Sequence, residues 1–184
     1  LPVLRNAEGR VQGGTDIPLN DAGREQARKL AGFLSEMPID VIAASTLSRA
    51  VDTADAIAAL HPMVRVKKLE QLVEMSYGTY EGKTEPHKTG AYAEVTARWA
   101  AGETHVRWPG GENPELVASR GLKGLEMIGL FDPAPGLGGI INRHILVAAH
   151  SRFNKIVMVR NAHTKRRIES SLPFFAPHFA LSHY

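Results

Sequence analysis

The stretch Ile39-Asp-Val-Ile-Ala-Ala-Ser45-Thr-Leu-Ser-Arg49 decides the fold, because a buried strand passes here directly into a helix. Residues 39–44 are apolar apart from one aspartate, which is typical of a strand covered on both faces in a parallel sheet. Ser45 ends the strand and is expected to cap the following helix. Apolar residues at helical spacing predict that helix: Leu47, Ala50, Val51, Ala54, Ile57 and Ala58.

Strands and helices alternate on both sides of this stretch. The alternation predicts an α/β fold with three layers, in which helices cover both faces of a mostly parallel sheet. No repeat or linker divides residues 1–184, so we expect one domain. The other predicted elements are helices at 20–34, 92–101 and 153–159, a helix that starts at Pro114, strands at 64–69 and 145–149, and a polar loop at 78–90. Asn20 is the expected cap of the first of these helices, and Asn113 is the expected cap of the helix that starts at Pro114.

Composition excludes several classes of protein. The 184 residues include no cysteine, so disulfides and thiolate metal sites are excluded. No apolar run approaches the roughly 20 residues that cross a bilayer. The basic runs at 65–68 and 163–167 are not interleaved with aromatic residues, so we interpret them as solvated surface and expect no nucleic-acid partner. The sequence does not indicate in which cellular compartment the protein works. We expect the cytoplasm by default, and an organelle is the alternative.

Three polar side chains follow the predicted strands at their carboxyl ends. Arg49 comes after the first strand, Glu74 after the second, and His150 directly after the third. Ligands of parallel sheets bind at this edge. An arginine, a carboxylate and a histidine brought together there would clamp a phosphoryl group and supply a proton.

Each of these residues also has a plainer interpretation. Arg49 could pair with Asp52 or another nearby carboxylate instead of an anionic ligand. His150 could be a structural histidine, and Glu74 a surface residue. From the residues alone these alternatives stay open, and only the combination of the three favours a site.

Five segments resemble, in order, the motifs of the histidine phosphatase (phosphoglycerate mutase-like) superfamily. The resemblance runs from about residue 6 to residue 158. The segments are Asn6-Ala-Glu-Gly-Arg10-Val-Gln12-Gly13 with Asp16-Ile-Pro18-Leu19-Asn20-Asp-Ala-Gly23-Arg-Glu-Gln26-Ala27, Ser45-Thr-Leu47-Ser-Arg49-Ala50-Val-Asp-Thr53-Ala54, Leu72-Val-Glu74-Met-Ser-Tyr77-Gly78-Thr-Tyr-Glu81-Gly82, Pro109-Gly110-Gly111-Glu112-Asn113, and Val147-Ala-Ala-His150-Ser151-Arg152-Phe153-Asn154-Lys155.

The resemblance implies phosphoryl transfer through a phosphohistidine, with no metal and no cofactor. Arg49 would clamp the phosphate and Glu74 would be the proton donor. His150 would be the second histidine of the site, beside the backbone N–H of Ser151. Asn6 and Gln12 would reach the phosphate from the first loop. The expected partner is a small phosphorylated substrate.

The family's first motif, Arg-His-Gly, is not present in this sequence. By register from Asn6, Leu1 would take the place of its glycine, so the nucleophilic histidine is expected just upstream of Leu1. The first strand of the sheet is then missing as well. Ser151 stands where the family often has glycine, and residues 160–184 do not resemble the family's ending.

We therefore expect a phosphomonoester hydrolase or mutase-like protein, active if the upstream nucleophile exists. A phosphatase is favoured over a mutase, because the cofactor-dependent mutases of the family carry a longer, arginine-rich segment at the place where this sequence has the short segment between Gly82 and Gly110. The alternative is an inactive pseudoenzyme that serves as a structural or interaction subunit of a larger assembly. It would meet a protein partner through the incomplete N-terminal edge or the C-terminal tail. A nucleotide-binding domain is disfavoured, since no glycine-rich phosphate loop is present.

Overall fold

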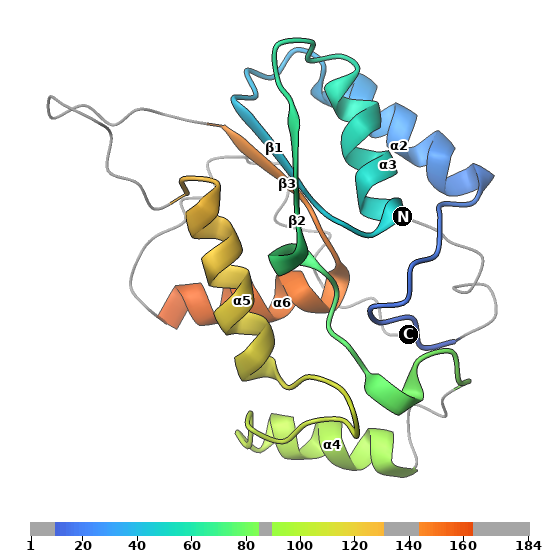
Figure 1. The fold of residues 1–184 in the computed structure, drawn as a ribbon, viewed down its shortest axis with the longest axis vertical. Helices are drawn as coiled ribbons and strands as arrows, with labels where there is room; N and C mark the ends of the chain where they lie inside the picture. The colour runs from blue at the N-terminus through green and yellow to red at the C-terminus, as the bar shows by residue number, and fades with distance from the viewer. Residues whose placement is uncertain (1–9, 85–89, 131–143, 164–184) are drawn as a thin grey trace, which may run out of the picture.

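The computed structural model describes residues 10–84, 90–130 and 144–163 (Figure 1). None of the helices in these ranges is long and apolar enough to cross a membrane. The elements in chain order are α2 (Asp21–Leu34), β1 (Val41–Ser45), α3 (Ser48–Ala58), β2 (Val66–Leu69), η1 (Glu70–Leu72), η2 (Gly78–Tyr80), α4 (Gly90–Ala100), α5 (Pro114–Met127), β3 (Ile145–Ala148) and α6 (Ser151–His163).

The sheet is parallel, with the strand order β2-β1-β3 in the described residues. In the central strand, Ile42 pairs with Val66 of β2 and with Leu146 of β3. Because all three strands point the same way, their carboxyl ends meet at one edge. The segments that follow β1, β2 and β3 therefore start close together, which is what places a site there.

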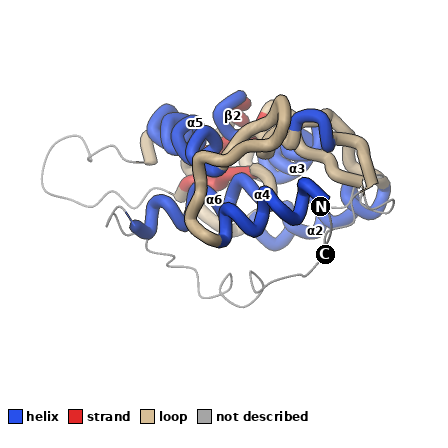
Figure 2. Tube along the Cα trace, turned by 90° about the horizontal axis from the view of Figure 1, so that it is seen from below, coloured by secondary structure: helices blue, strands red, loops and turns tan. Residues whose placement is uncertain are grey.

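Helices cover both faces of the sheet, as the sequence predicted (Figures 1 and 2). Successive residues of β1 point to opposite faces. Val41 and Ala43 belong to the core cluster with residues of α5 and α6. Ile42 and Ala44 belong to the cluster formed with α2 and α3. All five residues of β1 are buried, which explains why this strand reads as a continuous apolar run.

The predicted start of α3 is wrong in one respect. Ser45 does not cap the helix; its Oγ accepts a hydrogen bond from the backbone N–H of Leu47, one residue before α3 begins. The capping oxygen comes instead from Asp16, whose Oδ1 accepts from both N and Oγ of Ser48 at 2.8 and 2.7 Å. A cap from 32 residues away ties the first loop to the start of α3, and a local pattern could not reveal it.

The other predicted elements are present with small shifts at their ends. Asn20 and Asn113 cap α2 and α5 as expected, each accepting a backbone N–H on its side-chain oxygen. The strand expected at 64–69 begins at Val66, and the helix expected from residue 153 begins at Ser151. The loop expected at 78–90 contains the short helix η2 in its described part. The prediction of a missing first strand concerns sequence before residue 10, which lies outside the described residues.

The two outer strands differ in their side chains. β2 carries the exposed residues Lys67 and Lys68, charges that discourage pairing with another chain at a sheet edge. β3 is apolar, and all four of its residues are partly exposed. In the described residues β3 pairs only with β1.

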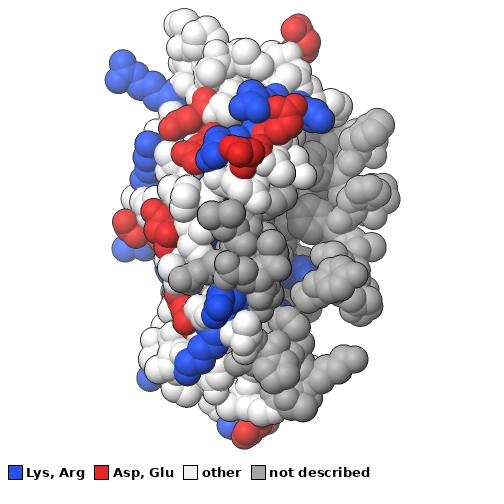
Figure 3. All heavy atoms as spheres, turned by 90° about the vertical axis from the view of Figure 1, so that its right-hand side faces the viewer, with Lys and Arg blue, Asp and Glu red and all other residues white. Residues whose placement is uncertain are grey.

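The surface beside α2 mixes charges of both signs. Arg24 pairs with Asp21, and Glu25 pairs with Arg28 and Lys29, all along the exposed side of the helix. Figure 3 shows basic and acidic side chains interspersed on the side of the molecule where α2 lies in Figure 1. Such exposed pairs contribute little to stability, so these charges mainly keep the helix solvated.

Candidate functional site

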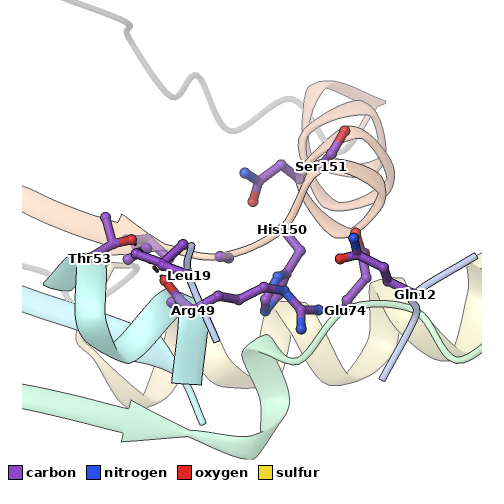
Figure 4. Close-up of a pocket in the computed structure, with 12 residues that line it drawn as sticks. Gln12, Leu19, Arg49, Thr53, Glu74, His150 and Ser151 are labelled. Carbon is purple, nitrogen blue, oxygen red and sulfur yellow. Dashed lines mark hydrogen bonds between the residues drawn. The ribbon is translucent and has the colours of Figure 1, made fainter. Parts of the chain in front are cut away.

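A pocket of about 390 Å³ opens at the carboxyl edge of the sheet (Figure 4). It is lined by Gln12, Leu19, Arg49, Ala50, Thr53, Glu74, Val147, Ala148, Ala149, His150, Ser151 and Asn154. The structure thus brings five of the six residues singled out from the sequence to one place. The sixth, Asn6, lies outside the described residues.

Arg49 is almost entirely buried, with 9% of its surface exposed, in the first turn of α3. Its Nη1 donates to the carbonyl of Thr15 at 2.9 Å, and its Nη2 donates to the carbonyl of Gly13 at 3.0 Å. A guanidinium has five N–H donors in a fixed plane. These two hydrogen bonds fix its orientation, and the other N–H groups remain available to a ligand. Burial lowers the pKa of Arg49, while Glu74, Asp16 and Glu81 oppose that shift.

The pairing of Arg49 with Asp52, left open by the sequence, is not the arrangement in the structure. Asp52 is exposed, whereas both recorded hydrogen bonds of Arg49 go to carbonyl groups of the first loop. Arg49 therefore holds residues 13–15 against α3 and faces the pocket. The buried cation at a helix N-terminus is unfavourable by itself, because it opposes the helix dipole, and this favours an anionic ligand.

Glu74 is anchored by backbone N–H groups instead of lying free on the surface. Its Oε1 accepts from Phe153 and Met75 at 2.8 and 2.9 Å, and its Oε2 accepts from Arg152 at 3.1 Å. Two of these donors belong to the first turn of α6, where a carboxylate is electrostatically favoured. Glu74 thus caps α6 and also lines the pocket.

Arg120 and Glu112 support the segment that carries Glu74. Arg120 of α5 donates to the carbonyls of Gln71, Val73 and Glu74 at 2.7–3.2 Å. Its guanidinium also makes a two-pronged pair with the Glu112 carboxylate, at 2.8 and 2.9 Å. Sequence analysis missed Arg120, because nothing near it in the chain distinguishes it. Glu112 was quoted only as part of a motif.

His150 ends the segment after β3 and is 7% exposed. Its Nε2 is buried and has no hydrogen-bond partner in the described part of the chain. Burial, and then the nearby charge of Arg49, lower the pKa of His150 to about 3, so the imidazole is neutral at pH 7. A buried polar atom without a partner is rare in proteins. Nε2 of His150 is therefore a candidate for contact with a ligand in the pocket.

Ser151 and Gln12 complete the pocket from two directions. Ser151 is the first residue of α6, so its backbone lies at the positive end of a 13-residue helix. Gln12 comes from the first loop, just before the residues that Arg49 holds. No group of three or more residues suited to a metal ion occurs in the described residues. The donors of this pocket are N–H groups and one cation, which suits an anion with several oxygens.

The parallel sheet flanked by helices is an α/β fold of the phosphoglycerate mutase-like class. The chain belongs to the histidine phosphatase superfamily (branch 1), whose family model matches residues 3–167. The resemblance stated from the motifs is thereby confirmed, as is the fold.

Individual relatives include both phosphatases and mutases. The chain is 32% identical over 161 residues to 2,3-bisphosphoglycerate-dependent phosphoglycerate mutase 2 of Gloeobacter violaceus, covering 86% of this chain and 70% of that protein. It is 33% identical over 126 residues to phosphoserine phosphatase 1 of Hydrogenobacter thermophilus, covering 65% and 59% respectively. The solved structure of mycobacterial hydrolase 1 matches with a TM-score of 0.72 and 26% identity, over 86% of this chain and 76% of that one. These relatives support a phosphatase- or mutase-like function.

The lowered pKa of His150 predicts a specific loss of stability in acid. The unfolded chain binds a proton on this histidine below about pH 6.5, whereas the folded chain does so only near pH 3. The free energy of unfolding should therefore fall as the pH drops from 6.5 toward 3. In His150→Gln this contribution is absent. Urea unfolding at pH 7 and pH 5 should show a smaller loss for the variant; equal losses would contradict the buried, neutral state of His150.

Proposed function

We propose that this chain binds the phosphoryl group of a small phosphomonoester in the pocket and takes part in its transfer through a phosphohistidine. The observation that carries the proposal is the buried, unpartnered Nε2 of His150 beside the buried guanidinium of Arg49. Both residues line one pocket, and a phosphoryl oxygen would accept a hydrogen bond from Arg49 and from His150 with its proton on Nε2. A phosphoryl dianion would also raise the pKa of His150, because it offsets the positive charge of Arg49.

The roles of the other residues follow from their positions. Gln12 and the N-terminus of α6 at Ser151 would contact the remaining phosphoryl oxygens. Glu74 would act where the leaving group departs, giving a proton to the leaving oxygen as the phosphorus–oxygen bond breaks. In the second step it would take a proton from the water that attacks phosphorus and releases the histidine.

A phosphatase is favoured over a bisphosphate-dependent mutase. In the described residues Arg49 is the only arginine or lysine that lines the pocket. Arg98, in the segment between Gly82 and Gly110, is exposed and pairs with Glu103. One cation matches one phosphoryl group, whereas a substrate with two phosphates needs further positive charge.

The transfer step requires a nucleophilic histidine in addition to His150. Among the described residues, no other histidine lines the pocket: His61 lies near the carbonyl of Leu34 and His144 precedes β3. The second candidate function is therefore a protein that binds phosphate without turnover and acts as an interaction subunit. The partly exposed apolar edge of β3 is the observation that favours it.

Phosphate binding tests the first half of the proposal. Calorimetric titration with inorganic phosphate or orthovanadate at pH 7 should show saturable binding to the wild-type chain. Arg49→Lys and His150→Gln should each weaken binding at least tenfold, about 1.4 kcal/mol, because each removes a fixed donor. Arg28→Lys, an exposed arginine that pairs with Glu25 and is exchanged in the same way, should bind as the wild type does. Equal affinity of all four proteins would contradict the proposed site.

Turnover tests the second half. With Glu74→Gln, hydrolysis of an alkyl phosphate should fall by about 10²–10⁴-fold, the usual size of a general-acid effect. Hydrolysis of p-nitrophenyl phosphate should fall much less, because its leaving group needs no proton. An acid-labile, alkali-stable phosphoenzyme should be trapped during turnover. Phosphate binding without hydrolysis of either ester would instead establish the non-catalytic alternative.

A further inference from the structure

Glu81 joins two loops that both reach the pocket but are far apart in the sequence. Its Oε2 accepts from the hydroxyl of Thr15 at 2.7 Å, and its Oε1 accepts from the backbone N–H of Gly14 at 3.1 Å. The same Oε1 accepts from the N–H of Tyr77 at 3.0 Å and from the hydroxyl of Ser76 at 3.1 Å. One carboxylate thus contacts the first loop and the loop that follows Glu74.

The first loop is held from two opposite sides. Arg49 binds its carbonyl oxygens, at Gly13 and Thr15, while Glu81 binds its N–H and hydroxyl groups, at Gly14 and Thr15. The two side chains are complementary, because Arg49 contacts acceptors of the segment and Glu81 contacts its donors. Together they set the direction in which the chain arrives from Gln12, which lines the pocket.

The packing of Gly13 shows how close this approach is. Gly13 has a φ of +55°, and a Cβ at this position would lie 2.4 Å from Oε1 of Glu81 and 2.9 Å from the ring of Tyr77. Only glycine fits such a conformation and such a contact without a shift. The loop therefore lies directly against the Glu81 carboxylate, and a displacement of that carboxylate moves the loop.

The other end of the Glu81 contact lies two and three residues beyond Glu74. Ser76 donates its backbone N–H to Glu112, whose carboxylate also pairs with Arg120, and Arg120 holds the carbonyl of Glu74. Glu81 is consequently the link between the first loop and a rigid support of the acid. All four of these hydrogen bonds come from uncharged donors, the N–H and hydroxyl groups of the two loops.

We infer that Glu81 is a positioning residue, which sets the distance between the Gln12–Arg49 side of the pocket and the Glu74 side. This inference rests on the proposed function. A residue that only stabilised the fold would change the unfolding midpoint and leave the affinity of the folded protein unchanged. A positioning residue changes the affinity for phosphate in protein that is still fully folded.

The test is calorimetric titration of the folded proteins with inorganic phosphate at pH 7. Glu81→Gln keeps the size of the side chain but removes its charge, and it turns the oxygen that accepts from the Thr15 hydroxyl into a donor. We expect 10- to 100-fold weaker binding. Thr15→Ala should weaken binding several-fold, and Thr15→Ser should restore it, because serine returns the hydroxyl that Glu81 accepts from.

A matched control is available in another threonine–glutamate pair. Glu115 accepts from the hydroxyl of Thr104 at 2.8 Å on the exposed surface, away from the pocket. Glu115→Gln should leave phosphate binding unchanged. If the wild type binds phosphate and Glu81→Gln and Thr15→Ala bind it equally well, Glu81 only supports the fold and the inference is wrong. If the wild type itself does not bind phosphate, the proposed function fails instead.

If Glu81→Gln does not fold, the comparison of Thr15→Ala with Thr15→Ser tests the inference by itself. Thr15→Ala removes one hydroxyl and leaves the carboxylate in place, so it is the milder change. Weaker binding by folded Thr15→Ala, with recovery in Thr15→Ser, supports the link through Glu81. Unchanged binding in both overturns it. In either case, circular dichroism and the unfolding midpoint confirm that the titrated protein is folded.

Discussion

The buried guanidinium of Arg49 is the constraint on which the rest of the site depends. Taking a positive charge out of water is costly, and the protein offsets that cost with two carbonyl oxygens and the nearby carboxylates of Glu74, Asp16 and Glu81. The same charge acts on His150, where it adds to burial in lowering the pKa. A neutral histidine beside a fixed cation is a site that attracts an anion with several oxygens.

The parallel topology explains how so few residues form this arrangement. β1, β2 and β3 end at one edge, so the segments that follow them need only a few residues to bring Arg49, Glu74 and His150 together. Glu74 then links two of these segments by capping α6, which itself begins directly after His150. The hydrogen bonds by which Glu74 caps α6 therefore also hold Glu74 next to His150 in the pocket.

Local patterns in the sequence were sufficient to predict the main elements and to predict that Arg49, Glu74 and His150 lie at one edge of the sheet. The apolar run of β1 and the caps at Asn20 and Asn113 act over a few residues, so they can be recognised without a structure. Arg49, Glu74 and His150 could be placed at one edge because strand ends in a parallel sheet coincide. Ser45 was misassigned because the actual cap, Asp16, comes from another part of the chain. Glu81 and Arg120 were not recognised, since their contacts span 66 and 46 residues.

The most direct test of this account is a crystal structure of the full chain with tungstate, a tetrahedral oxyanion that the anomalous signal of the metal locates without ambiguity. The account predicts tungstate in the pocket, with its oxygens within hydrogen-bond distance of Arg49 and of Nε2 of His150. An ion bound only at exposed basic residues such as Lys67 and Lys68, with none in the pocket, would contradict it.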